Sequence, residues 1–206
     1  MAITSSTDIG NMALDLLSAD TVNDIDNPES ATEELLARWY PQARKKVLRE
    51  HPWNCASKRI VLAASATSPA FGYESAFPLP NDFIRLKYIT DDEGNIIPAS
   101  KYTVENGNVL YEGSGLYLVY VYDMTDVASM DVMLVDLIAI ELAMMIANKI
   151  TDSGTETSKL ADLQKQRTAL AKAIDGQENP PFRIQYSRAL NSRRNRTDYR
   201  TDRVIW

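Results

Sequence analysis

The chain has 206 residues, of which 45% are hydrophobic and 24% charged, a length and composition typical of a soluble globular protein with one or two domains. Its single cysteine, Cys55, excludes an internal disulfide and a zinc site built from cysteines, and it fits a cytoplasmic origin. The net charge of −6 is uneven: residues 183–206 hold seven arginines against two aspartates, or +5, so residues 1–182 carry −11 and are expected to repel DNA.

The first part of the chain predicts helices within residues 5–50. Apolar side chains recur at helical spacing from Ile9 to Leu17, and a polar loop follows. Ser30 and Glu33 then form a capping-box pattern ahead of a long helix, in which Pro41 is a candidate kink. This helix is predicted to end at His51-Pro52, because the residue before a proline avoids helical geometry.

Residues 53–122 predict a small antiparallel sheet of four to six strands. The stretches SKRIVLAA, FIRLKYI and LYLVYVYDM are rich in β-branched and aromatic residues. Asn106-Gly107, between two β-prone runs, is a strong hairpin signal. Residues 116–122 are apolar on both faces, so we expect both faces to be covered, the second by a neighbouring subunit if the sheet is small.

The helical period returns in residues 129–176 and predicts two further helices. The first, over residues 131–150, is strongly apolar, but Asp136 and Glu141 interrupt it and make it a poor membrane span. Helical N-terminal and C-terminal segments around a small antiparallel sheet give the fold class α+β.

The last helix is predicted over residues 157–174, and Gly176 is expected to end it. The two prolines after Asn179 then end regular structure. The chain divides there into a body, residues 1–178, and an extended C-terminal arm, residues 179–206. The buried face of the last helix is predicted to consist of Leu160, Leu163, Leu170 and Ile174, with Arg167 among them.

The residues most often used in catalysis lack the partners that they would need. His51 is the only histidine and is interpreted as a helix-end residue. Cys55 is interpreted as a small buried hydrophobe rather than a nucleophile. The chain has no phosphate loop, dinucleotide fingerprint or nucleophile elbow, and DDEGN lacks the spacing of a calcium loop. We therefore expect no catalytic residue, metal or cofactor.

Two short motifs and the order of the elements resemble a known family. Pro52-Trp53 closes a basic helix in RWYPQARKKVLREHPWNCASKRIVLA, and a Leu-Pro-Asn-Asp turn, Leu79 to Asp82, precedes a strand in FPLPNDFIRLKYI. Over residues 5–176 the chain resembles the head-to-tail adaptors of short-tailed bacteriophages, the tail tubular protein A family.

This resemblance implies a structural protein of the virion, made in the host cytoplasm, which catalyses no reaction and contacts no membrane. Its subunits would form a dodecameric ring between the portal ring and a tail nozzle of the tail tubular protein B kind. DNA would pass through the channel without specific binding, since an acidic lumen repels phosphates. The apolar, Met-rich helix would suit packing between subunits. The candidate interface residues are Met133, Leu137, Met144 and Met145.

The arm is interpreted as an anchor for the portal. A free arm cannot bury enough surface to order itself and would fold on docking, while arginines offer forked hydrogen bonds to carboxylates and Trp206 offers an apolar plug. Repetition around a ring would add avidity. The alternative is a solvated, disordered terminus. The candidate portal-binding residues are Arg183, Tyr186, Arg188, Arg193, Arg194, Arg196, Tyr199, Arg200, Arg203, Ile205 and Trp206.

Two other function classes stay open. A cell-wall hydrolase would use a pair of carboxylates across a cleft, and Asp and Glu are plentiful in the chain, although no pattern selects a pair. A nucleic-acid-binding regulator would place the arginine-rich arm on phosphates and would bind DNA in a salt-sensitive way.

Overall fold

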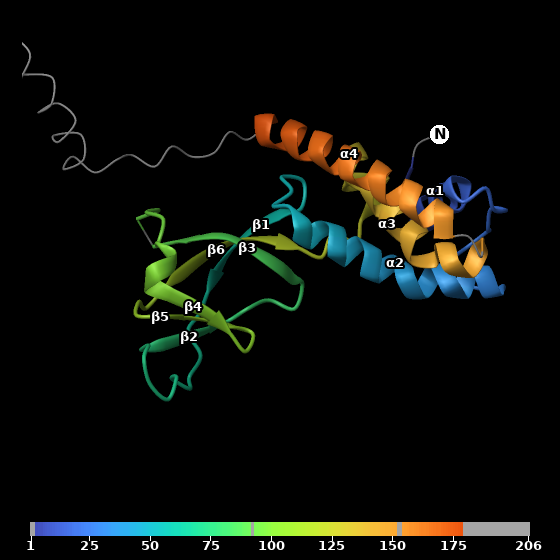
Figure 1. The fold of residues 1–206 in the computed structure, drawn as a ribbon. Helices are drawn as coiled ribbons and strands as arrows, with labels where there is room; N and C mark the ends of the chain where they lie inside the picture. Colours follow the sequence, from blue (N-terminus) through green and yellow to red (C-terminus); the bar gives the residue numbers. More distant parts are fainter. Residues whose placement is uncertain (1–2, 92, 152–153, 179–206) are drawn as a thin grey trace, which may run out of the picture.

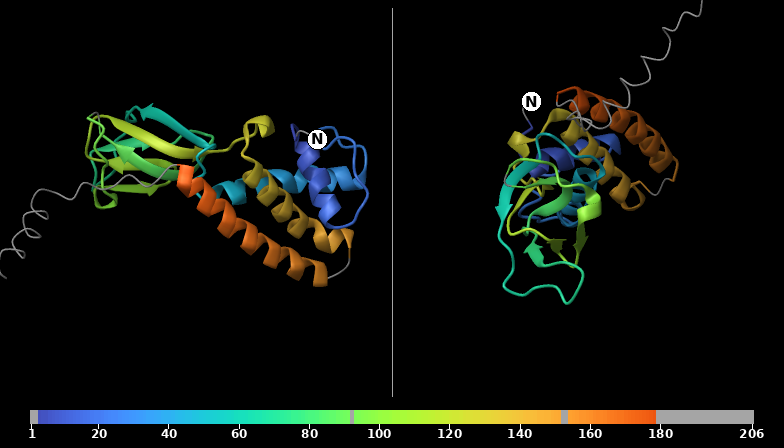
Figure 2. Two further views of the ribbon diagram at one scale, coloured as in Figure 1. Left: turned by 90° about the horizontal axis from the view of Figure 1, so that it is seen from above. Right: turned by 90° about the vertical axis from the view of Figure 1, so that its left-hand side faces the viewer.

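The computed structural model describes residues 3–91, 93–151 and 154–178 and has the expected α+β fold, with helices in one lobe and strands in the other (Figure 1). The molecule is elongated, and α1 lies at the end of the helical lobe that is farthest from the strands (Figure 2). The helices are α1 (Ser6–Leu16), α2 (Ala31–Glu50), α3 (Val132–Ile150) and α4 (Gly154–Glu178). The strands are β1 (Ser57–Leu62), β2 (Ser75–Pro78), β3 (Phe83–Thr90), β4 (Tyr102–Glu105), β5 (Asn108–Tyr111) and β6 (Leu116–Tyr122). Two short 3-10 helices are Ala99–Lys101 and Val127–Ser129.

The start and end of α2 follow the predicted local signals. The capping box between Ser30 and Glu33 is present, and α2 then runs as one helix of 20 residues through Pro41. The proline is therefore accommodated without ending the helix. His51 is extended, with φ of −139°, which confirms the end predicted from Pro52.

The end of α4 differs from its prediction. The helix continues through Gly176 to Glu178, so the expected stop at Gly176 is wrong. A glycine inside a helix costs only about 1 kcal/mol relative to alanine, and contacts of the preceding residue, Asp175, hold this last turn against the segment that follows α2.

The buried face of α4 is also turned relative to its prediction. Leu160 is buried as expected, but Leu170 is 50% and Ile174 40% exposed, whereas Ala171 is buried. A polar contact explains part of this rotation, since Gln164 donates to the buried carboxylate of Glu141 on α3. Positions 160, 164 and 171 share one helix face, so this contact turns the two apolar side chains toward solvent.

The six strands form two three-stranded antiparallel sheets rather than one, in the orders β1-β6-β3 and β2-β5-β4. The predicted β4–β5 hairpin is confirmed, with positive φ at both Asn106 and Gly107, the conformation that favours this pair of residues. The two sheets enclose a second hydrophobic core, separate from that of the helical lobe, around Phe77, Leu118 and Tyr120. Short strands of four residues bury enough apolar surface only when two sheets face each other.

Strand β6 is covered on both faces over part of its length, as its composition predicts. Leu118 and Tyr120 point into the core between the sheets. On the other face, Val121 is fully buried against the helical core. Tyr117, farther along the same face, is 37% exposed. The helices of the same chain therefore supply the second cover near one end of the strand and leave the other end open.

An ion pair joins the lobes, and a buried indole closes α2 next to it. Arg44 of α2 donates from Nε and Nη2 to the two carboxylate oxygens of Asp123, at 2.9 and 3.1 Å, directly after β6. Trp53 is 1% exposed and donates from its indole nitrogen to the carbonyl of Val47 at 3.0 Å. A forked arginine pair and a buried indole both fix direction as well as distance, so the orientation of the lobes is set at this junction.

Glu33 is expected to make the free energy of unfolding depend on pH. Its carboxylate accepts hydrogen bonds from the backbone of Asn23, Glu29 and Ser30, and these lower its pKa from 4.5 to about 2. Because the folded state binds this proton less tightly than the unfolded chain does, the stabilisation is complete above about pH 4.5 and is lost as the pH falls toward 2.

Glu33→Gln should therefore be less stable than the wild type at neutral pH and should approach it near pH 2. Urea unfolding at a series of pH values measures the difference. Glu34→Gln is the matched control, because Glu34 lies exposed in the same helical turn and should leave the pH dependence unchanged. If the free energy of unfolding of Glu33→Gln changed with pH in parallel with that of the wild type, Glu33 would not be the source of this pH dependence.

Candidate interaction surfaces

The predicted portal-binding residues all belong to the arm and lie outside the described part of the chain. They are Arg183, Tyr186, Arg188, Arg193, Arg194, Arg196, Tyr199, Arg200, Arg203, Ile205 and Trp206. The described body ends at Glu178, the last residue of α4. Asp175 and Gly176, near the end of α4, border a groove.

The four predicted interface residues of α3 do not share one environment. Leu137 is 2% exposed and belongs to the core of the chain itself, where a second subunit does not reach it. Met133, Met144 and Met145 are half-buried and pack against the same core. This helix therefore contributes mainly to the core, which is the commoner role of methionines at helical spacing.

A groove of about 880 Å³ lies where the end of α4 meets the outer face of the β1-β6-β3 sheet. Val61 of β1 and Tyr117 and Val119 of β6 line it with apolar surface. His51 and Asp175 border it on the helical side. The groove, which we call the junction groove, is the part of this sheet face that the helices leave open.

Asp175 ties the end of α4 to the segment after α2. His51 Nε2 lies 2.9 Å from its carboxylate, and the backbone N–H of Asn54 donates to the same carboxylate at 2.9 Å. His51 also packs edge-on against Trp53, with ring centroids 4.8 Å apart. His51 is thus held by structural contacts at the end of a helix, as its place before a proline indicates.

The environments of Lys87 and Cys55 shift their pKa values in opposite directions. Burial lowers the pKa of Lys87, whose Nζ donates to Ser57 Oγ at 2.9 Å at the edge of the junction groove. Burial also raises the pKa of the Cys55 thiol, which packs half-buried against the helical core. A raised thiol pKa disfavours the nucleophilic thiolate.

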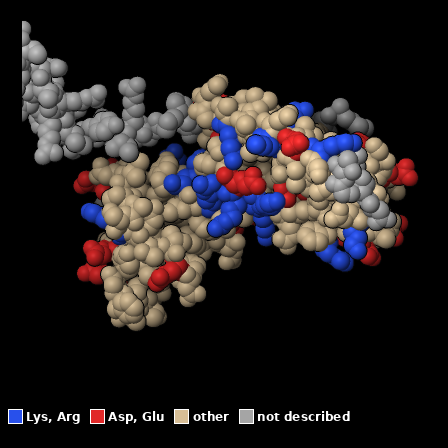
Figure 3. Space-filling model, in the orientation of Figure 1, with Lys and Arg blue, Asp and Glu red and all other residues tan. Residues whose placement is uncertain are grey.

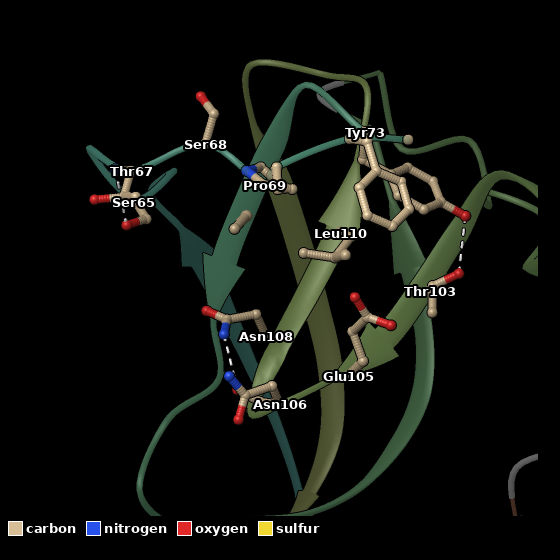
Figure 4. Close-up of a pocket in the computed structure, with 14 residues that line it drawn as sticks. Ser65, Thr67, Ser68, Pro69, Tyr73, Thr103, Glu105, Asn106, Asn108 and Leu110 are labelled. Atoms are coloured by element: carbon tan, nitrogen blue, oxygen red, sulfur yellow. Dashed lines mark hydrogen bonds between the residues drawn. The ribbon is translucent and has the colours of Figure 1, made fainter.

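A second hollow, of about 570 Å³, lies in the β-lobe between the loop of residues 63–74 and the β4–β5 hairpin. Figure 4 shows hydroxyl and amide side chains around it, including the hydrogen bond between Tyr73 and Thr103 at 2.8 Å. Phe71, at the tip of the loop, is 88% exposed. Polar walls and an exposed aromatic residue fit a protein contact better than a buried small-molecule site.

Neither cavity brings two described carboxylates together. Asp175 is the one acidic residue among those that line the junction groove, and Glu105 is the one that lines the hollow in the β-lobe. A glycosidase-type mechanism would need a pair at a defined separation. Among the described residues, no group of three or more His, Cys, Asp and Glu side chains is arranged to hold a metal ion.

The Leu-Pro-Asn-Asp turn is anchored on both sides through Asp82. Its carboxylate accepts a hydrogen bond from Lys58 Nζ at 2.7 Å and one from the Tyr120 hydroxyl at 2.9 Å, and these bonds lower the pKa of Asp82 against the opposing effect of burial, the largest single influence. Its carbonyl accepts from the backbone of Asp123 at 2.7 Å. The turn thereby connects β1, β3 and β6.

The distribution of charge is a feature that the whole-chain totals hide. Residues 1–37 contain eight acidic and no basic residues, whereas residues 38–87 contain nine basic and three acidic ones, a net of +6. Lysine and arginine atoms gather where the helices meet the strands (Figure 3). We call residues 38–87 the basic band. Counting charges segment by segment would have revealed it, whereas the net charge of −11 for residues 1–182 hides it.

Comparisons with known proteins add no family assignment. A scan against models of protein families finds no match, and a search of curated proteins finds no significant match. Among the described residues, no helix is long and apolar enough to cross a membrane.

Proposed function

We propose that the protein is a head-to-tail adaptor of a phage virion, a structural subunit whose dodecameric ring joins the portal to the tail nozzle and leaves a channel for the genome. The observation that carries this proposal is the position of the two family motifs at the helix–sheet junction. Pro52-Trp53 closes α2 there, and the turn ending at Asp82 ties three strands together. Residues that fix the two lobes relative to each other are what a rigid ring subunit needs.

Exposed apolar side chains support assembly with partners. Phe71, Val132 and Val61 are 88%, 75% and 65% exposed in the single chain. They lie in both lobes, on a loop, at a helix start and on a strand. Val61 forms a group with Ile96 and Tyr117 in the junction groove, and exposed apolar side chains grouped in this way commonly mark protein–protein contacts.

The test of this function is assembly on portal rings. We expect analytical ultracentrifugation of the purified chain alone to show mostly small species, and addition of portal to give ring-sized mass. The physical reason is avidity, since weak contacts between neighbours add to weak contacts with the portal. A stable dodecamer of the isolated chain at low concentration would contradict the portal-driven route, and no binding to portal would overturn the function.

The basic band favours one further candidate, a nucleic-acid-binding regulator. The two functions differ in affinity for double-stranded DNA at physiological salt. An adaptor with an acidic body should bind it weakly, whereas a regulator should bind with nanomolar affinity that falls steeply with salt. A filter-binding assay separates these outcomes.

A further inference from the structure

The junction groove combines an apolar floor with a basic edge. Val61, Ile96 and Tyr117 line it and are 65%, 48% and 37% exposed. Arg59 and Lys87 stand at its edge. Exposed apolar side chains grouped in a groove beside cations are suited to a protein segment that carries both apolar and acidic residues.

Asp175 is the one described carboxylate that lines this groove, and it attracts Lys87 electrostatically, but no described carboxylate forms an ion pair with the cations of this edge. Arg85 donates to the carbonyls of Arg49 and Glu50, directly before His51, and Arg49 donates to the carbonyl of Ile84. These bonds hold both guanidinium groups where the end of α2 meets β3, directly before the groove residue His51, without pairing them with a described carboxylate. We call four cations of this region, none of which forms a salt bridge with a described carboxylate, the basic rim. They are Arg49, Arg59, Arg85 and Lys87.

The same chain carries a complementary surface at its opposite end. Residues 15–34, from the end of α1 to the first turn of α2, lie in the part of the helical lobe farthest from the strands (Figures 1 and 2). We call this stretch the acidic end. Its exposed acidic residues are Asp15, Asp20, Asp26, Glu29 and Glu34.

We propose that the junction groove binds the acidic end of a second copy of this chain. The two surfaces of one chain cannot meet, because the 20-residue helix α2 separates them by about 30 Å at 1.5 Å per residue. The arm carries +5, so the basic rim repels it. DNA phosphates would pair with the cations of the rim but would leave the apolar side chains of the groove floor exposed to water. The acidic end offers carboxylates to the rim, and Leu16, which is 36% exposed, to the apolar floor.

Such a contact is heterologous, because each copy offers its groove to one neighbour and its acidic end to another. Contacts of this kind generate rings when the rotation between neighbours closes, and open filaments when it does not. The inference rests on the proposed function only for closure into a ring. The pairwise contact stands on the two charged surfaces alone.

The test is a charge swap in the full chain, followed by sedimentation velocity over a concentration series at low and high salt. Arg49→Glu with Arg59→Glu reverses the charge at two of the four rim positions, and Asp20→Lys with Glu29→Lys does so at two of the five exposed acidic positions of the acidic end. Each pair of reversals should weaken self-association at low salt about tenfold or more, because the net attraction between the two surfaces is removed and the contacts at the changed positions become repulsive. Combining all four changes in one chain should restore it, and so should an equimolar mixture of the two reversed proteins.

Lys101→Glu with Glu105→Lys is the matched control, since both residues are exposed and belong to neither surface. Arg59→Glu alone keeps the test available if the double rim variant fails to fold. Wild-type association that salt and both reversals leave unchanged would overturn the proposal. So would an absence of wild-type association at every concentration and salt, or rim-dependent retention of double-stranded DNA, which would make the rim a polyanion site.

Portal binding separates this proposal from the proposed function. If both reversed variants still form complete rings on portal, the contact is wrong and the adaptor function survives. If the wild type ignores portal while the charge swap still governs self-association, the contact is right and the adaptor function is wrong.

Discussion

A chain that ends after Glu178 is expected to fold like the full-length protein and to lose portal binding completely. The described buried residues of both hydrophobic cores lie between Ile9 and Ala171, so the body has cores of its own. Truncation should therefore leave the midpoint of thermal unfolding nearly unchanged. Pull-down on portal rings measures the loss of binding.

Single changes in the arm should show how it binds. Trp206→Ala should weaken portal binding by on the order of 2 kcal/mol per arm if the indole fills a pocket on the portal. Arg200→Glu with Arg203→Glu should weaken docking further, by an amount that shrinks at high salt if these contacts are exposed. Asn195→Ala is a control within the same arm. A truncated protein that still caps portal rings would place the interface in the body.

Trp53→Ala is expected to destabilise the body more than any surface change. The side chain is 1% exposed, and its indole N–H satisfies the carbonyl of Val47. Replacement by alanine leaves a cavity and an unpaired buried carbonyl at the junction of the lobes. The free energy of unfolding should fall by about 3–5 kcal/mol, the usual range for a buried tryptophan. Urea unfolding followed by circular dichroism measures it.

Trp39→Ala is the matched control, because Trp39 belongs to α2 and is 37% exposed. Trp39→Ala should lower the free energy of unfolding far less than Trp53→Ala, because part of the Trp39 side chain is already exposed to water. Trp53→Phe should fall between the two variants, because it keeps most of the volume but loses the hydrogen bond to Val47. Equal costs for Trp53→Ala and Trp39→Ala would show that the junction does not depend on Trp53.

Local features of this fold could be predicted from sequence because the interactions that cause them lie within a few residues. Ser30 and Glu33 bond within one helical turn, Pro52 acts on the residue before it, and Asn106-Gly107 is a pair that tolerates positive φ. The number of strands and the α+β class follow from the same local periodicities.

The candidate site could be predicted only in part. The two motifs at the junction were recognisable as short stretches, but the junction groove, which Pro52 borders, was not. It is lined by residues of β1, β6 and the end of α4, which meet only after the lobes have docked. The charge asymmetry between residues 1–37 and 38–87 was present in the sequence, yet its consequence depends on which side chains remain exposed and unpaired.

The sequence by itself determined where α2 begins and ends and where the β4–β5 hairpin turns, through a cap, a proline and a turn pair. It did not determine the bounds of α4, predicted over residues 157–174 and found at Gly154–Glu178, or the position of β2. Tertiary structure alone decided how these elements face one another. Leu170 and Ile174 of α4 point to solvent although their spacing predicts burial, because Gln164 and Asp175 bind groups distant in sequence. The six strands form two sheets because each small sheet buries its apolar face by packing against the other sheet. The basic rim exists because α2 ends against β3, where Arg49 and Arg85 bond to backbone carbonyls instead of carboxylates.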